Sequence, residues 1–255
     1  MWQEHLQGRQ IGLRQGRQDF DPARPSLLCV HGSGGNSKNF LPQLAGLSGQ
    51  VNVVAIDLPG HGQTPGPGHE QVADYAAWLG DFLAAGPLRP VLLGHSLGGA
   101  VVMQLALERP HLARGLILAG TGSRLKVLPA ILEGVLQNFQ ATVPLIVRNA
   151  YAPEVDPRFI EQGVVEMSQV DPQVLWGDFT ACDRFDISHR LGEISLPAWC
   201  IVGDSDRLTP IKYSQYLAQH IAGAGLTIIE KAGHMAQLEK PAAFNEAVLD
   251  FMAGR

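Results

Sequence analysis

The clearest indication of the fold is the segment Val91-Leu92-Leu93-Gly94-His95-Ser96-Leu97-Gly98-Gly99. Its first three residues predict a short buried strand, and residues 97–107, stopped by Pro110, predict a helix. Gly-X-Ser-X-Gly between a strand and a helix fits a sharp turn with a serine at its apex. Glycine suits positions 94 and 98 because larger side chains there would collide with neighbouring backbone. The turn lifts the Ser96 hydroxyl clear of the sheet, at a helix N-terminus whose N–H groups stabilise negative charge.

Outward from this turn, short apolar runs alternate with helical patterns. The runs are rich in Val, Ile and Leu and are bounded by Gly, Pro or Asp, which is typical of strands buried on both faces of a parallel sheet. They span residues 26–30, 51–56, 91–93, 116–119, 199–202 and 226–229. An antiparallel hairpin is expected before them, from Trp2 to Leu13. The pattern predicts an α/β fold with a mostly parallel sheet flanked by helices.

Residues 121–190 interrupt this alternation, because they contain no strand-like run. Apolar residues recur there at helical spacing, and Asp156-Pro157 and Asp171-Pro172 each pair an N-cap residue with a proline suited to a first helical turn. We therefore expect a helical insertion of three or four helices. The predicted organisation is a core domain in two parts, 1–120 and 191–255, with a helical cap over 121–190.

The composition indicates a folded domain with no nucleic-acid partner. The 255 residues are 45% hydrophobic and 17% charged, which excludes intrinsic disorder and suits one large α/β domain or two small ones. Asp and Glu number 24 against 19 Lys and Arg. This acidic excess argues against binding to nucleic acid, which needs clustered cations.

Sequence signals for a membrane or for export are missing. No segment approaches ~20 uninterrupted apolar residues, so we expect no membrane partner. The start Met1-Trp2-Gln3-Glu4-His5 lacks the basic and apolar regions of a signal peptide. The three cysteines, Cys29, Cys182 and Cys200, form no recognisable disulfide framework. These observations predict a cytoplasmic protein.

A base and a carboxylate for Ser96 follow the last two predicted strands. A serine hydroxyl is a poor nucleophile unless a base takes its proton. His234 is the best candidate among nine histidines, because its loop lies at the carboxyl edge of the sheet, where catalytic groups of open α/β folds converge. A carboxylate must then hold the base in the right tautomer. Asp204 and Asp206 both follow the strand 199–202; we choose Asp206, deeper in the loop, and expect Asp204 to form a turn.

A second glycine-rich segment, His31-Gly32-Ser33-Gly34-Gly35, follows the strand that ends at Val30. Its backbone N–H groups can pair with that of Leu97 to form an oxyanion hole, and a flexible turn is the alternative. No Gly-Lys-Ser/Thr follows, so the segment is not a phosphate loop.

Two further segments complete a resemblance to a known family. They are Asp57-Leu58-Pro59-Gly60-His61-Gly62 and Gly233-His234 with the downstream Lys240-Pro241. With these and the serine turn, the chain resembles the α/β-hydrolase family over nearly its whole length. The resemblance implies an eight-stranded, mostly parallel sheet with a helical cap inserted after the sixth strand.

The resemblance also implies a role for each site residue. Ser96 is the expected nucleophile, Asp206 the acid and His234 the base. Ser33 and Leu97 are expected to supply the oxyanion N–H groups, with Gly34 as the alternative to Ser33.

The histidines outside this triad are expected to be structural. Asp57 and His61 are expected to hold their loop, and His31 and His95 to brace the loops of the site. The spacing of these histidines and His69 fits no metal-ligand set, so we expect neither a metal nor a cofactor.

The expected reaction is hydrolysis of a carboxylic ester of a small or medium-sized acyl substrate through an acyl-enzyme. Haloalkane dehalogenases and epoxide hydrolases resemble this fold but need aspartate in place of Ser96. A thioester, a lactone or the carbon–carbon bond of a vinylogous diketone are alternatives on the same triad. Met235 stands where ring-cleavage hydrolases usually carry Trp, which weighs against the last of these. An acyltransferase and a ligand receptor with little turnover are further alternatives.

The cap is the only part of the sequence that bears on the substrate. Its apolar side chains are candidates to line an acyl pocket, although core packing explains each of them as well. These candidates are Leu128, Leu132, Val135, Phe139, Trp176 and Phe179. Four cations could meet a substrate carboxylate or simply be solvated: Arg124, Lys126, Arg148 and Arg184.

Overall fold

The apolar runs of the sequence form the central sheet of the computed structural model, which describes residues 10–86 and 88–254. The strands in these residues are β1 (Leu13–Gln15), β2 (Ser26–Val30), β3 (Asn52–Ile56), β4 (Val91–His95), β5 (Gly115–Ala119), β6 (Ala198–Gly203) and β7 (Gly225–Ile229). The run predicted at 26–30 coincides with β2, and the other five differ from the observed strands by one or two residues in total, at one end or, for β6, at both. The hairpin expected from Trp2 to Leu13 lies largely outside the described residues.

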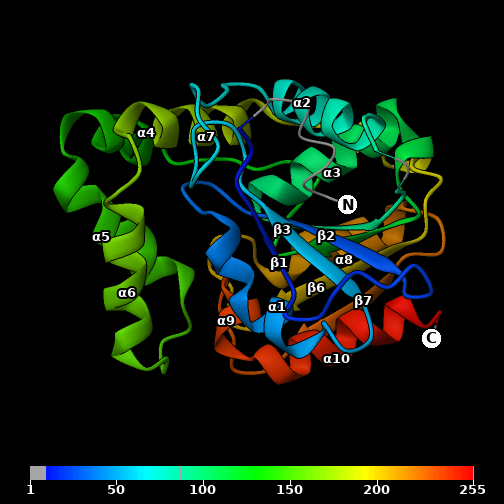
Figure 1. Cartoon of the computed structure of the whole chain (residues 1–255). Coiled ribbons are helices and arrows are strands. Elements are labelled where there is room, and N and C mark those ends of the chain that lie inside the picture. Colours follow the sequence, from blue (N-terminus) through cyan, green and yellow to red (C-terminus); the bar gives the residue numbers. More distant parts are fainter. Residues whose placement is uncertain (1–9, 87, 255) are drawn as a thin grey trace.

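The strand order is β1-β3-β2-β4-β5-β6-β7 (Figure 1). β1 pairs antiparallel with β3, and every other neighbouring pair is parallel, which confirms the predicted mostly parallel α/β sheet. The carboxyl ends of parallel strands share one edge of the sheet. The loops that follow β2, β4, β6 and β7 therefore meet at this edge, where open α/β sheets bind their ligands.

Helices cover both faces of the sheet, as Figure 1 shows. α2 (Val72–Ala84), α3 (Leu97–Glu108) and α8 (Ile211–His220) pack on one face, against side chains such as Leu28. α1 (Leu41–Gly46) and α10 (Pro241–Met252) pack on the other face, against its neighbour Cys29. Since successive strand side chains point to opposite faces, continuous apolar strands supply both cores. No helix in the described ranges is long and apolar enough to cross a membrane.

The predicted helical insertion follows β5 and stands to the left of the sheet in Figure 1. It contains α4 (Pro129–Gln137), α5 (Phe139–Ala150), α6 (Pro157–Met167) and α7 (Pro172–Arg184). The side chains of Asp156 and Asp171 accept hydrogen bonds from backbone N–H groups at the starts of α6 and α7, so both predicted N-caps are confirmed.

The number of strands in the described residues is one fewer than the resemblance implies. The resemblance implies eight strands and an insertion after the sixth. The described part of the chain holds seven strands, with the insertion after the fifth, and the strand predicted before Leu13 falls on residues outside that part. Extension of the cap over the whole of 121–190 as a separate domain stays a prediction.

Candidate active site

Ser96 lies at the apex of the sharp turn between β4 and α3, with φ 54° and ψ −118°. A Cβ at Gly94 would overlap the carbonyl group of Gly98, and a Cβ at Gly98 would overlap the carbonyl oxygen of Val30. These overlaps confirm why the sequence has glycine at both positions. The strained backbone at Ser96 is the price of presenting this side chain outward.

The Ser96 side chain is free to meet a ligand. Its neighbours His95 and Leu97 are buried, whereas Ser96 is only half-buried and lines a cavity. Its hydroxyl makes no capping hydrogen bond to α3, although it stands at the N-cap position. The carbonyl oxygen of Ser96 is held by the Thr121 hydroxyl at 2.8 Å, and its N–H donates to Ala119 at 3.0 Å. The backbone is thus fixed, while the hydroxyl has no hydrogen-bond partner among residues 10–86 and 88–254.

His234 and Asp206 come together from the loops after β7 and β6. The distance between His234 Nδ1 and Asp206 Oδ2 is 2.9 Å, and both residues are buried. Because a carboxylate only accepts, Nδ1 carries a proton and donates it to Asp206. His234 and Ser96 line the same cavity.

Every oxygen of the Asp206 carboxylate has two donors. Oδ1 accepts from the backbone N–H groups of Leu208 and Thr209 at 2.9 and 2.8 Å, and Oδ2 accepts from the Thr209 hydroxyl at 2.8 Å as well as from His234. Burial alone would raise the pKa of Asp206. His234 and the Thr209 donors outweigh it and hold this pKa below the ordinary range, so the group stays ionised.

Asp204, the alternative carboxylate, does not reach the histidine. It is exposed, and its Oδ1 accepts the hydroxyl of Ser205 at 2.8 Å. The turn role expected for Asp204 agrees with this position.

His31 and His95 bind protein groups on either side of the site. His95 Nε2–H donates to the carbonyl of His234 at 2.9 Å. His31 Nδ1–H donates to the carbonyl of Gly32 at 2.9 Å, and its Nε2 accepts from Leu58 N–H at 3.0 Å. Burial, the largest cause, lowers the pKa of His31 to about 4 and that of His95 to about 3, so both rings are neutral. The described ranges contain no group of three or more His, Cys, Asp or Glu side chains placed to hold a metal ion.

The glycine-rich loop after β2 lies against Ser96. A Cβ at Gly32 would come within 2.9 Å of the Ser96 Cβ, so only glycine allows this approach. Gly34 N–H donates to Asp178 Oδ2 at 2.8 Å and is therefore occupied. Within residues 10–86 and 88–254, neither Ser33 N–H nor Leu97 N–H has a hydrogen-bond acceptor. Of the two alternatives in this loop, the geometry favours Ser33 over Gly34 as a free donor.

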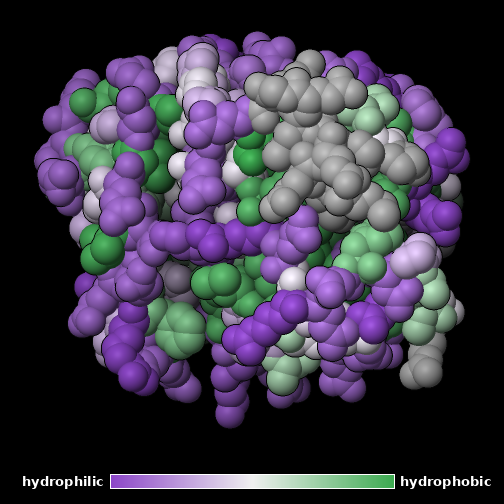
Figure 2. Space-filling view, viewed as in Figure 1, coloured by the Kyte–Doolittle hydropathy of each residue, from purple (hydrophilic) through white to green (hydrophobic). Residues whose placement is uncertain are grey.

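The cavity beside Ser96 has a volume of about 380 Å³ and lies between the core and the insertion. Its insertion wall comes mainly from α5, α6 and the residue after α5, with Phe179 from α7, and is mostly apolar: Ile146, Val147, Ala150, Tyr151, Phe159, Gly163, Met167 and Phe179. Figure 2 shows hydrophobic residues at the surface between insertion and core, on a face that is otherwise mostly hydrophilic. Lys38 and Glu166 also line the cavity and form an ion pair of 3.2 Å between core and insertion. The size and lining are typical of a site for a small molecule.

Only one of the residues predicted to line the substrate pocket lines the cavity. Phe179 lines the cavity, whereas Leu128, Leu132, Phe139 and Trp176 are not among its lining residues. Leu128 is 71% exposed. Phe139 and Trp176 pack against the apolar cluster inside the insertion, whose buried members include Val135.

None of the four candidate cations lines this cavity. Lys126 and Arg184 pair with Asp183 and Glu70 at 3.5 and 3.1 Å, and Arg124 and Arg148 are exposed.

Sequence reasoning missed three polar residues around the site. Thr209 supports Asp206, Asp178 holds Gly34, and Glu239 accepts from Gly233 N–H and Ala152 N–H, both at 2.9 Å. A signal for Asp178 was present, because it shares the buried stripe of α7 with Val174, Leu175, Ala181 and Cys182 at helical spacing. Thr209 lies three residues after Asp206, within reach of local side-chain hydrogen bonds.

Comparisons with known proteins bear on the family and the fold. A family model described as "Alpha/beta hydrolase family" matches residues 27–247. The solved structure of a thermophilic esterase is 35% identical, covers 96% of this chain and 93% of its own, and has a TM-score of 0.85. The pimeloyl-[acyl-carrier protein] methyl ester esterase of Neisseria meningitidis is 29% identical over 93% of this chain and 97% of its own length. An enol-lactonase from Burkholderia xenovorans, 21% identical with a TM-score of 0.88 over 95% of this chain and 96% of its own, shares the fold.

Proposed function

The chain belongs to the alpha/beta hydrolase family, and from this premise we propose that it is a serine esterase. Its substrate is the carboxylic ester of a small or medium-sized acyl group, and the reaction proceeds through an acyl-enzyme. One observation carries the proposal: Ser96, on a strained turn with an unused hydroxyl, lines the same cavity as His234, whose Nδ1–H is committed to Asp206.

The proposed reaction assigns each group one task. Ser96 Oγ attacks the acyl carbon while His234 Nε2 takes the hydroxyl proton, and Asp206 stabilises the imidazolium. The free N–H groups of Ser33 and Leu97 donate to the oxyanion. When the ester C–O bond breaks, His234 returns the proton to the leaving alcohol. Water then attacks the acyl-enzyme with His234 again as base, which releases the acid and regenerates Ser96.

The cavity and the relatives support an ester with an apolar acyl part. The α5 and α6 wall offers mainly hydrocarbon surface, and the volume of about 380 Å³ suits a chain of moderate length. The thermophilic esterase and the pimeloyl-[acyl-carrier protein] methyl ester esterase carry ester hydrolysis in their names. We infer ester hydrolysis for this chain from both, and a methyl ester belongs among the substrates to test.

Initial rates on p-nitrophenyl esters from acetate to dodecanoate, beside the matching methyl esters, test the proposal. Sustained turnover by the wild-type protein, with a rate maximum at one acyl length, is the expected result. Ser96→Ala is expected to lose on the order of 10⁶ in kcat. Thr121→Ser, which keeps a hydroxyl beside the turn, is the control variant for changes near Ser96 that leave the nucleophile in place.

The alternatives give different results in the same assay. A single burst without turnover would indicate a receptor, and ester product formed from an added alcohol would indicate an acyltransferase. Faster turnover of a matched thioester or lactone would indicate that this compound class, and not a carboxylic ester, is the substrate. Full activity of Ser96→Ala would refute the mechanism.

A further inference from the structure

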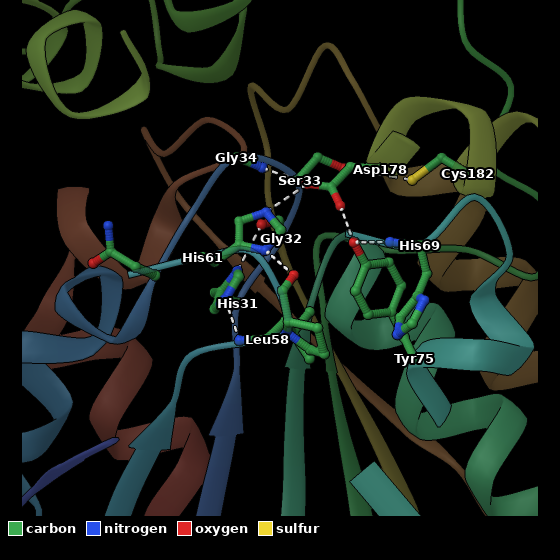
Figure 3. A network of polar contacts seen from close by, with 12 residues as sticks. His31, Gly32, Ser33, Gly34, Leu58, His61, His69, Tyr75, Asp178 and Cys182 are labelled. Atoms are coloured by element: carbon green, nitrogen blue, oxygen red, sulfur yellow. Dashed lines mark hydrogen bonds and ion pairs between the residues drawn. The ribbon is translucent and has the colours of Figure 1, made fainter. Parts of the chain in front are cut away.

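Asp178 lies on α7 in the insertion, yet all of its hydrogen-bond partners belong to the core (Figure 3). Oδ2 accepts from Gly34 N–H at 2.8 Å and lies 2.9 Å from His61 Nε2, and Oδ1 accepts from the Tyr75 hydroxyl at 2.6 Å. The carboxylate is fully buried. A buried carboxylate is costly unless donors satisfy it, and three donors from three separate core segments do so here.

The His61 ring is charged in this arrangement. Nδ1 lies 3.0 Å from the carbonyl oxygen of Pro59, which can only accept, so Nδ1 carries a proton. Nε2 faces the Asp178 carboxylate, so it carries a proton as well. Burial alone would lower the pKa of His61, but the Asp178 charge and hydrogen bond outweigh it, and the pKa is raised. His31, 4.9 Å away between ring centres, has one donor and one acceptor partner and is neutral.

The network ends on the loop that supplies the proposed oxyanion donor. Asp178 takes Gly34 N–H out of use, and the Ser33 hydroxyl lies 3.6 Å from the Cys182 sulfur one turn further along α7. Gly34 itself has φ 63°, a left-handed conformation that glycine adopts without steric cost. With Gly34 N–H held toward α7, the neighbouring Ser33 N–H is left for the cavity that both residues line.

We propose that Asp178 is a positioning residue of the oxyanion hole, which holds Gly34 against α7 so that Ser33 N–H is presented to the substrate carbonyl. This role rests on the proposed esterase function. It makes the seating of the insertion a condition for oxyanion stabilisation, because the carboxylate that orients the loop belongs to the insertion and is neutralised by His61 of the core.

Asp178→Asn tests this role with little change of shape, because it removes the charge that attracts both His61 and Gly34 N–H. Oxyanion donors act on the transition state, so a displaced Ser33 N–H lowers kcat more than it raises KM. We expect kcat for the best p-nitrophenyl ester to fall by about 10- to 100-fold, with KM within about threefold. Affinity for an alkyl trifluoromethyl ketone, whose adduct with Ser96 carries an oxyanion, should fall by a similar factor.

Tyr75→Phe is the matched control. It removes a hydrogen bond to the same carboxylate and between the same two parts of the molecule, but it does not touch the glycine-rich loop. If Asp178 merely fixes the insertion, both variants will lower the melting temperature and change kcat alike. We expect both to lower the melting temperature and only Asp178→Asn to change kcat and ketone affinity by more than about threefold.

The wild-type protein offers a test that does not depend on a variant folding. In protein labelled with ¹⁵N at serine and glycine, the trifluoromethyl ketone should shift the Ser33 amide resonance strongly and leave the Gly34 amide protected from exchange before and after binding. A shift of Gly34 in place of Ser33 would overturn the proposal, and so would wild-type kcat in folded Asp178→Asn.

The same experiments distinguish an error in the proposed esterase function from an error in the role of Asp178. Wild-type protein that neither hydrolyses esters nor binds the ketone refutes the function itself and, with it, this role for Asp178. Ester hydrolysis that depends on Ser96 but not on Asp178 refutes only the positioning role.

Discussion

At the level of single residues, the three proposed catalytic side chains differ in how many hydrogen bonds each one makes. The Asp206 carboxylate accepts four hydrogen bonds, and His234 Nδ1 donates one of them. The Ser96 hydroxyl has no hydrogen-bond partner in the described part of the chain. The number of hydrogen bonds thus decreases from Asp206 to His234 to Ser96. This order suits a carboxylate that must stay ionised, a base that must exchange one proton and a nucleophile that must react. Thr209 contributes two of the four donors and is the residue whose removal tests this order.

Thr209→Val removes the hydroxyl that donates to Asp206 Oδ2 and keeps the backbone donor. Loss of one hydrogen bond to a charged group should reduce kcat/KM roughly 5- to 30-fold, with KM nearly unchanged. Asp206→Asn, which leaves His234 without its carboxylate, should cost about 10⁴ in kcat. Steady-state kinetics of the two variants check this order, and equal losses would contradict it.

The sequence predicts the residues whose signal is local. Ser96 stands inside its own motif, and His234 and Asp206 directly follow apolar runs. Asp178 was missed because its partner Gly34 is 144 positions away in the chain and the contact exists only once α7 is seated on the core. Of the Ser33 and Gly34 alternatives, only the structure shows which N–H is already engaged.

At the level of secondary-structure elements, the strand–turn–helix around Ser96 depends on a close backbone contact between α3 and β2. Gly98 packs against the backbone of Val30 at the end of β2, so the start of α3 touches the strand beside β4. This contact places Ser96 next to the glycine-rich loop, because that loop begins at the end of β2. Strand and helix positions could be predicted from apolar periodicity and N-caps, whereas this contact between elements could not.

Gly98→Ala tests the contact. The added methyl meets backbone, which cannot rotate away, so the turn must shift; we expect a loss of about 1–3 kcal/mol in the free energy of unfolding together with a large loss of activity. Gly192→Ala is the control, because nothing lies within 4 Å of a Cβ at Gly192. Urea denaturation and ester hydrolysis measure both effects, and a fully active Gly98→Ala would show that the turn tolerates a Cβ.

The cavity wall on α5 offers a second test at this scale. Ile146 lines the cavity and is 7% exposed, while its neighbour Leu145 is 57% exposed and does not line it. Ile146→Phe fills part of the space for the acyl chain, so the preferred p-nitrophenyl ester should become shorter by about two or more carbons. Leu145→Phe on the same helix should leave the preference unchanged. Equal profiles for both variants would place the acyl chain elsewhere.

At the scale of the whole molecule, buried histidines connect the protonation state with stability. His95 and His31 are neutral in the folded state, with pKa values of about 3 and 4 against an ordinary 6.5. Below pH 6.5 the unfolded chain therefore binds more protons than the folded one, and stability falls as the pH drops. His61 acts in the opposite direction, because its raised pKa gives stability that is present below the unfolded value and lost as the pH rises through the folded pKa.

Stability should therefore be highest near neutral pH. His95 alone should lower the free energy of unfolding by roughly 3 kcal/mol between pH 6.5 and pH 4. His95→Gln keeps a donor for the His234 carbonyl and removes the titrating ring, so its acid limb should be shallower than that of the wild type. The exposed His111→Gln is the control. Urea midpoints across this pH range measure the slopes, and identical slopes for wild type and His95→Gln would contradict the prediction.

The overall architecture follows from the sequence more completely than the pocket does. Alternating apolar runs predict a parallel sheet, and a parallel sheet brings the loops of Ser96, Asp206 and His234 to one edge. Several apolar residues of the insertion, however, belong to its own core and line the cavity as well, among them Ile146, Val147 and Tyr151. Phe179, Phe139 and Trp176 all pack against the apolar cluster of the insertion, but only Phe179 of the three also lines the cavity, and periodicity alone does not separate these cases.

If Ser96 is the nucleophile, it forms an acyl-enzyme, and peptide mass spectrometry of the quenched reaction detects this intermediate. Protein mixed with a p-nitrophenyl ester and stopped with acid within milliseconds should carry the acyl mass on the peptide that contains Ser96, and Ser96→Ala should carry none. Acylation of another residue, or turnover by the wild type with no acylated peptide at any quench time, would contradict the account.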